Sequence, residues 1–147
     1  MRRCGQVGGE AGGAGGGGDV VGGAVGAGVD QVRAGVVGRW FEAKGFDDDS
    51  AYVAETVVSE LVTNAYKHAA GAGEGIVVRL FSSEGGPVVE VWDRSEQPPV
   101  VQPLRLHGTS GRGLAMVEML AEAWGYNPLA SGGKAVFAVL RAVREPG

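Results

Sequence analysis

Hydrophobic side chains recur at the three- and four-residue spacing of an amphipathic helix in three parts of the chain. The first part covers residues 29–45, where the final glycine is typical of a helix end. The second follows the acidic stretch at residues 47–50, which supplies negative charge and a capping oxygen, and it runs to about Ala69. The third covers residues 111–124. The pattern therefore predicts three helices.

Short runs rich in valine predict strands at residues 76–81, 88–92 and 135–140. Residues 82–87 between the first two runs contain two glycines and a proline, which predicts a hairpin. Residues 96–110 contain three prolines and predict no regular element. The resulting order favours an α+β fold, a two-layer α/β sandwich with helices on one face of a mixed, mostly antiparallel sheet.

The N-terminal part of the chain has a different composition from the rest. Residues 5–28 hold 13 of the 28 glycines, which lose much backbone entropy on folding and offer no side chain to pack. We expect residues 1–28 to form a disordered leader, although a start codon assigned too far upstream would look the same. The predicted domain covers residues 29–142, and residues 143–147 form a tail.

Charge and cysteine content narrow the functional class. The net charge of −4 and the lack of a basic run argue against nucleic acid as a partner. No apolar run approaches the roughly 20 residues of a membrane span. Cys4 is the single cysteine, and the residues after it are glycine-rich rather than the apolar core of a signal peptide. We expect a cytoplasmic protein without a membrane partner.

Polar residues interrupt the apolar side of the second predicted helix. The row that starts at Val53 and Val57 continues along or beside Glu60, Asn64 and His68. The functional interpretation gives Glu60 the task of activating a nucleophile and makes Asn64 an oxygen ligand of Mg²⁺. A solvated pair on an exposed helix face is equally consistent with the spacing. His68 is interpreted as satisfying the helix end.

Asp93 ends the second predicted strand on the same face as Val89 and Val91, which is the core side. A carboxylate at the end of a buried row needs a donor, and the exocyclic amine of adenine is one candidate. The alternative is an Asp that caps the following turn with Ser95.

Glycines are concentrated in residues 108–114, at the start of the third predicted helix. Backbone N–H groups there can approach a phosphate, and Arg112 can add a charged contact. A flexible loop with a helix cap explains the segment equally well. A dinucleotide-binding fold is rejected, because a proline-rich segment rather than a strand precedes the glycines.

The order of these elements resembles that of the GHKL ATPase superfamily. Its N, G1 and G2 boxes resemble residues 60–65 (Glu-Leu-Val-Thr-Asn-Ala), 91–95 (Val-Trp-Asp-Arg-Ser) and 111–117 (Gly-Arg-Gly-Leu-Ala-Met-Val). With the segments at 120–125 and 133–137, the chain is similar to stand-alone histidine-kinase-like ATP-binding proteins of actinobacteria. These are relatives of the anti-sigma-factor serine kinases.

This resemblance implies a Bergerat-type fold, ATP and Mg²⁺ as cofactors, and a short ATP lid at residues 96–110. Glu60 is then the catalytic base, Asn64 the Mg²⁺ ligand and Asp93 the adenine anchor. The implied nucleotide-binding set is Asn64, Asp93, Ser95, Gly108, Gly111, Arg112, Gly113 and Leu114.

The chain departs from the family pattern at three places. Residues 94–98 replace the glycines expected after the G1 aspartate. Ala135 stands where a threonine often binds a water near adenine. The strand expected before the first helix falls in the leader, where only residues 19–21 resemble one.

The resemblance implies a protein serine kinase of the anti-sigma type, which phosphorylates a small anti-sigma-factor antagonist and also sequesters a sigma factor. It is also compatible with a homodimer. The altered G1 box and Ala135 support an alternative, a non-catalytic, nucleotide-gated module that binds a protein partner. A chain that has lost nucleotide binding is the third hypothesis.

Overall fold

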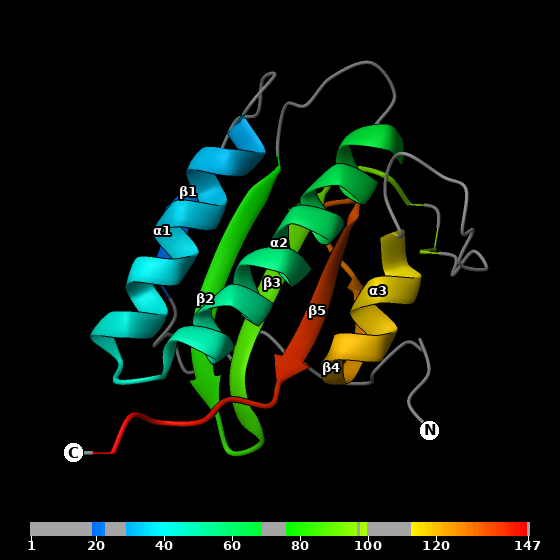
Figure 1. The fold of residues 1–147 in the computed structure, drawn as a ribbon. Helices are drawn as coiled ribbons and strands as arrows, with labels where there is room; N and C mark the ends of the chain where they lie inside the picture. The colour runs from blue at the N-terminus through cyan, green and yellow to red at the C-terminus, as the bar shows by residue number, and fades with distance from the viewer. Residues whose placement is uncertain (1–18, 23–28, 69–75, 97, 100–112, 147) are drawn as a thin grey trace, which may run out of the picture.

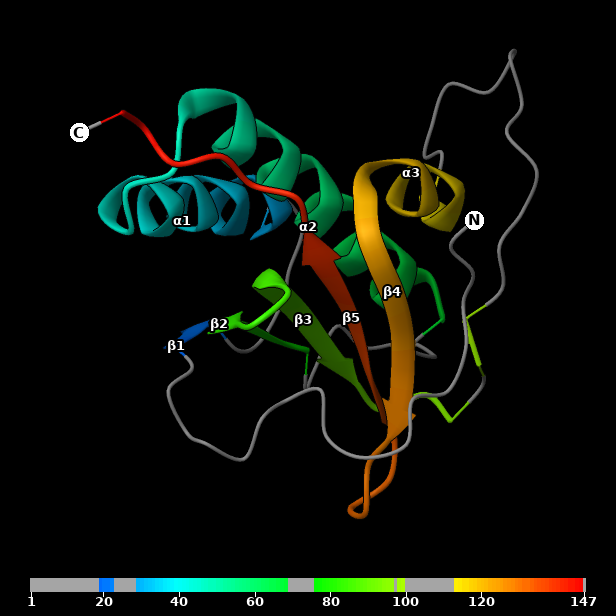
Figure 2. The same ribbon diagram turned by 90° about the horizontal axis from the view of Figure 1, so that it is seen from below.

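The computed structural model describes residues 19–22, 29–68, 76–96, 98–99 and 113–146. In these described residues, three helices cover one face of a five-stranded sheet (Figures 1 and 2). The elements, in chain order, are β1 (Asp19–Gly22), α1 (Val29–Ala43), α2 (Asp48–His68), β2 (Val77–Ser83), β3 (Gly86–Asp93), α3 (Gly113–Leu120), β4 (Ala121–Pro128) and β5 (Lys134–Leu140).

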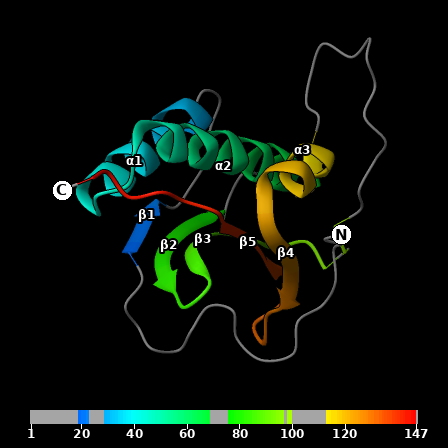
Figure 3. The same cartoon turned by 60° about the horizontal axis from the view of Figure 1, so that its bottom comes forward.

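The strand order is β1-β2-β3-β5-β4, and every pair of neighbouring strands that the structure describes is antiparallel. The predicted two-layer α+β sandwich is therefore confirmed. The expected mixed sheet is wrong in detail, because no parallel pair occurs among these five strands. Figure 3 shows α1 above β1 and β2, α2 over the middle of the sheet, and α3 above β4.

The described part of the sheet contains two strands outside the predicted elements. β1 (Asp19–Gly22) lies in the segment expected to be a disordered leader, at the residues that resemble the strand of the family pattern, and it pairs with β2. The other residues up to 28 lie outside the described part of the chain. The second unexpected strand is β4, which begins directly after α3 ends at Leu120. The predicted helix to residue 124 is thus too long.

A register shift explains why β4 looks helical in the sequence. The pairing with β5 is irregular between Ala121 and Ala123. Glu122 and Ala123 are consecutive exposed residues, and Trp124 and Gly125 are consecutive buried ones. A bulge of this kind breaks the alternation by which a strand is recognised. The remaining apolar spacing matched a helix instead.

The connection between α1 and α2 follows the sequence closely. Gly45 has a φ of +89°, and the N–H of Phe46 donates to the carbonyl of Phe41 at 3.0 Å, which closes α1. Asp47 caps α2, since its Oδ1 accepts the Ser50 N–H at 2.9 Å. The two helix boundaries predicted from local chemistry are confirmed.

The residues after β5 are held against this connection. The Val143 carbonyl accepts the N–H of Asp47 at 2.8 Å, and the Val143 N–H donates to the hydroxyl of Ser50 at 2.8 Å. Glu145 donates its N–H to the carbonyl of Gly45 at 2.8 Å. The C-terminal segment thereby fastens the end of the sheet to the helical layer.

The main core lies between the helices and the inner face of the sheet. The strands contribute side chains at alternate positions, and α2 contributes one apolar face. Its principal members are Phe41, Ala54, Val57, Val58, Leu61, Val62, Val78, Leu80, Val89, Val91, Leu114, Val117, Trp124, Val136, Ala138 and Leu140. A smaller cluster of Phe81, Val88 and Phe137 lies on the other face.

Candidate functional site

Glu60 connects α2 to the first residue of α3. Its Oε1 accepts the backbone N–H of Gly113 at 2.8 Å, although the two residues are 53 positions apart. Gly113 has a φ of +53°. The first N–H groups of a helix have no partner within the helix and carry partial positive charge, so a carboxylate is stabilised there. The structure thus brings together two of the predicted site residues.

Asn64 lies one turn after Glu60 on α2 and is partly exposed. The next predicted residue in the described region, Leu114, is buried in the core through its side chain. The remaining predicted residues of the glycine-rich segment, Gly108, Gly111 and Arg112, lie outside the described residues.

Asp93 is placed on the inner face of the sheet at the end of β3, as the alternation predicted. Its side chain is about 1% exposed. Oδ1 accepts the N–H of Ser95 at 2.8 Å, which is the turn-capping contact considered from the sequence. Oδ2 is buried and has no hydrogen-bond partner within the described part of the chain. The carboxylate therefore caps the turn and keeps one acceptor unused.

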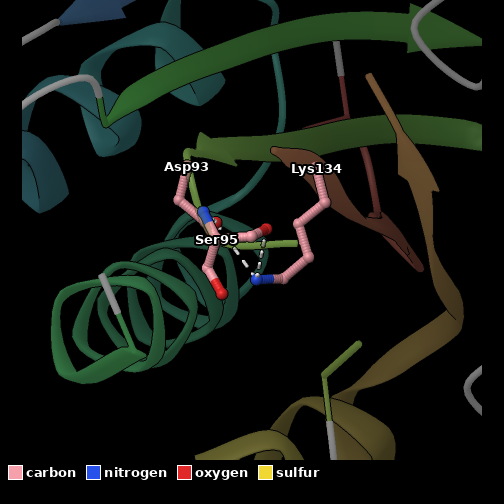
Figure 4. Close-up of polar contacts among 3 residues, drawn as sticks. All are labelled: Asp93, Ser95 and Lys134. Atoms are coloured by element: carbon pink, nitrogen blue, oxygen red, sulfur yellow. Dashed lines mark hydrogen bonds and ion pairs between the residues drawn. The ribbon is translucent and has the colours of Figure 1, made fainter. Parts of the chain in front are cut away.

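Lys134 is the residue of this site that the sequence reasoning missed. It lies directly opposite Asp93 in the β3–β5 pairing, and its Nζ is 3.1 Å from Asp93 Oδ1 (Figure 4). The expectation for Ala135 is wrong, because Ala135 pairs with Trp92 and lies on the other face. Alternation from Val136 could have placed Lys134 on the core side.

A close backbone contact holds this corner of the sheet together. A Cβ atom added to Gly133 would lie 2.1 Å from the carbonyl oxygen of Asp93 and 2.9 Å from Cα of Arg94. Gly133 also has a φ of +88°, a conformation that side-chain-bearing residues rarely adopt. Only glycine fits at this position, and its presence lets β5 enter beside the end of β3.

A cavity of about 300 Å³ opens at the same corner, between the end of β3 and the β4–β5 turn. Its volume is at the lower end of the range of small-molecule sites. The residues that line it are Trp92, Asp93, Arg94, Leu129, Ser131 and Gly132.

Three segments therefore supply the candidate site: the C-terminal half of α2, the end of β3 with the start of β5, and the start of α3. Figure 1 shows the α2, β3 and α3 parts gathered at one side of the molecule. The unused Oδ2 of Asp93 fits the amine of a nucleobase. Asn64 offers one oxygen, which suits Mg²⁺ because this ion retains water and phosphate ligands.

The described ranges contain no group of three or more His, Cys, Asp or Glu side chains arranged to hold a metal ion. None of their helices is long and apolar enough to cross a membrane.

Residues 27–140 match the family model described as the histidine kinase-like ATPase domain. A similar solved structure contains the RsbU and RsbW domains of Rv1364c from Mycobacterium tuberculosis, with 20% identity and a TM-score of 0.63. The match covers 88% of this chain and 34% of that one, so this chain spans about a third of its length. No curated protein matches the sequence.

The SiaB–SiaC complex from Pseudomonas aeruginosa is similar at 14% identity and a TM-score of 0.58. That match covers 84% of this chain and 89% of the other. At these identities, both likenesses establish the fold alone.

Proposed function

We propose that this chain, which belongs to the histidine kinase-like ATPase family, is an ATP-binding regulatory protein with serine kinase activity. Its substrate would be a small protein antagonist of an anti-sigma factor, and the same chain would sequester a sigma factor. The observation that carries the proposal is the contact of Glu60 with the Gly113 N–H at the start of α3. It places a carboxylate beside a helix N-terminus, where phosphate groups bind favourably.

In this proposal Glu60 acts on the serine hydroxyl of the substrate protein. The carboxylate accepts the hydroxyl proton while the serine oxygen forms a bond to the γ-phosphorus, and the bond from phosphorus to the leaving oxygen of ADP breaks. Mg-ATP supplies the phosphoryl group and the charge of the metal ion. Such transfer depends mainly on positioning and electrostatic stabilisation, so the fixed location of Glu60 beside α3 supports its role.

The other predicted residues take binding roles. Asp93 would accept the adenine amine through Oδ2, and Asn64 would bind the metal ion. Ser95 holds the turn that orients Asp93. We propose that phosphate contacts come from Gly113 and Leu114 together with Gly108, Gly111 and Arg112, and that the Gly113 N–H passes from Glu60 to the phosphate when ATP binds.

The test measures transfer of labelled phosphate from ATP to a candidate antagonist protein. Glu60→Gln keeps the side-chain shape and removes the base, so transfer should fall by about 10²-fold or more while Mg-ATP binding persists. Glu55→Gln is the matched control, because Glu55 is another partly buried carboxylate of α2 outside the site. Undiminished transfer by the Glu60 variant would show that Glu60 is not the base.

A second candidate function is a nucleotide-gated module that binds a protein partner without transferring phosphate. The observation that favours it is the altered segment after Asp93, where residues 94–98 replace the glycines of the family pattern and the N–H of Ser95 closes the turn on Asp93 Oδ1. This candidate predicts ATP binding with no transfer to any partner. Thermal unfolding gives the first measurement, since Mg-ATP at 100 times its Kd stabilises the folded state by about 2.7 kcal/mol.

A further inference from the structure

Asp93 and Lys134 form a buried ion pair on the inner face of the sheet. The two side chains are 1% and 3% exposed, and Nζ lies 3.1 Å from Oδ1. They stand at the ends of two otherwise apolar rows, one that includes Val91 on β3 and one that includes Val136 on β5. Removing two charges from water is costly, and an apolar pair of similar size often stabilises a fold as well or better. The pair therefore calls for a role other than stability.

The hydrogen bonds of the pair are incomplete in a specific way. Oδ1 of Asp93 accepts from both Lys134 and the N–H of Ser95, whereas Oδ2 is buried without a partner. The ammonium of Lys134 has three N–H groups, and its second acceptor, the Ser95 carbonyl, is at 3.5 Å, the outer limit of a hydrogen bond (Figure 4). A strong acceptor and a strong donor thus lie side by side.

We infer that Lys134 is a specificity-determining residue that recognises the ring nitrogen of adenine next to its amine. This inference rests on the proposed nucleotide site. The amine of adenine donates to Oδ2 of Asp93, and the neighbouring N1 accepts from the Lys134 ammonium. A 6-oxopurine presents an acceptor and a donor in the reverse order, so both contacts become unfavourable. The Asp93 carboxylate alone would select only for an amine, and Lys134 adds a requirement for a hydrogen-bond acceptor next to that amine.

The experiment compares ATP with 1-deaza-ATP, in which a C–H group replaces N1, by titration calorimetry on the full chain. Wild type should bind ATP about tenfold or more tightly than 1-deaza-ATP, because a hydrogen bond to a charged group is lost. In Lys134→Met the ratio of the two affinities should fall to about one. Arg141→Met is the matched control, since it removes an exposed cation directly after the opposite end of β5, and it should keep the wild-type ratio.

Lys134→Met leaves a buried carboxylate without its cation, so Asp93→Asn with Lys134→Met serves as a neutral second variant if the single one does not fold. A tenfold preference for ATP in either folded variant would overturn the inference. So would tighter ATP binding by Lys134→Met with an unchanged ratio, because the lysine would then only compete with the base. Wild type that binds both nucleotides equally refutes this inference alone, whereas wild type that binds neither refutes the proposed function with it.

Discussion

Replacing Gly133 by alanine tests how the nucleotide corner of the sheet is built. Gly132 and Gly133 are consecutive glycines in the β4–β5 turn, with φ values of +97° and +88°. An added Cβ at Gly132 meets only the flexible carboxylate end of Glu96 at 3.5 Å. At Gly133 the same atom meets the rigid carbonyl oxygen of Asp93 at 2.1 Å. The two variants share the backbone strain and differ in the collision.

The expected losses of stability follow from the backbone strain and from the collision of the added Cβ atom. A side chain at positive φ costs about 1–3 kcal/mol, which applies to both alanine variants. At Gly133 the oxygen must also move by more than 1 Å to reach ordinary contact at 3.4 Å. Displacement of this kind in a packed region costs a further 1–3 kcal/mol, approximately. We therefore expect Gly133→Ala to be less stable than Gly132→Ala by about 1–3 kcal/mol.

Urea unfolding of wild type and both variants gives the two free energies of unfolding. Thermal unfolding provides a second readout, since 1 kcal/mol shifts the Tm of a domain this size by about 2–4 °C. Because the collision displaces Asp93, Gly133→Ala should also lose Mg-ATP affinity, whereas Gly132→Ala should retain it. Equal stability of the two alanine variants, within about 0.5 kcal/mol, would refute the reasoning.

Three further predictions concern charged and polar side chains. Lys134→Met should lower the free energy of unfolding, measured with urea, by about 3–5 kcal/mol, because it leaves the buried Asp93 carboxylate without its cation. Adding Asp93→Asn should recover most of this loss, and a double variant as unstable as the single one would contradict the explanation. Hydrogen bonds from the hydroxyl of Ser50, and to a smaller extent from its N–H, lower the pKa of Asp47 in the folded protein below the ordinary value of 3.8. The ionised Asp47 therefore stabilises the fold fully above pH 3.8, and this contribution is lost as the pH falls through the lower pKa of the folded state. Acid unfolding should therefore be steeper below pH 3.8 in wild type than in Asp47→Ala, and identical curves contradict the link. Asn64→Ala should weaken binding of ATP more with Mg²⁺ than with EDTA, and equal weakening argues against a metal ligand.

Local chemistry was enough to predict the parts of the fold that depend on neighbouring residues. The helix end at Gly45 and the cap at Asp47 each rest on contacts within five positions. β4 was missed, and β1 was assigned to the disordered leader although residues 19–21 resemble a strand, because the evidence for both strands is not local. β1 is a four-residue strand among glycines that gains its hydrogen bonds from β2. β4 is an edge strand whose bulge removes the period of two that identifies a strand.

The same distinction separates the predicted from the unpredicted parts of the site. Asp93 could be placed on the core side by alternation within its own strand, but its partner depends on how β3 and β5 are aligned. A shift of one residue in that pairing would present Ala135 to the inner face in place of Lys134. The register is fixed by the turn before β5, where only glycine at position 133 can approach Asp93. The Gly-Gly pair is therefore more than a turn signal, because it selects which β5 side chain shares the buried corner with Asp93.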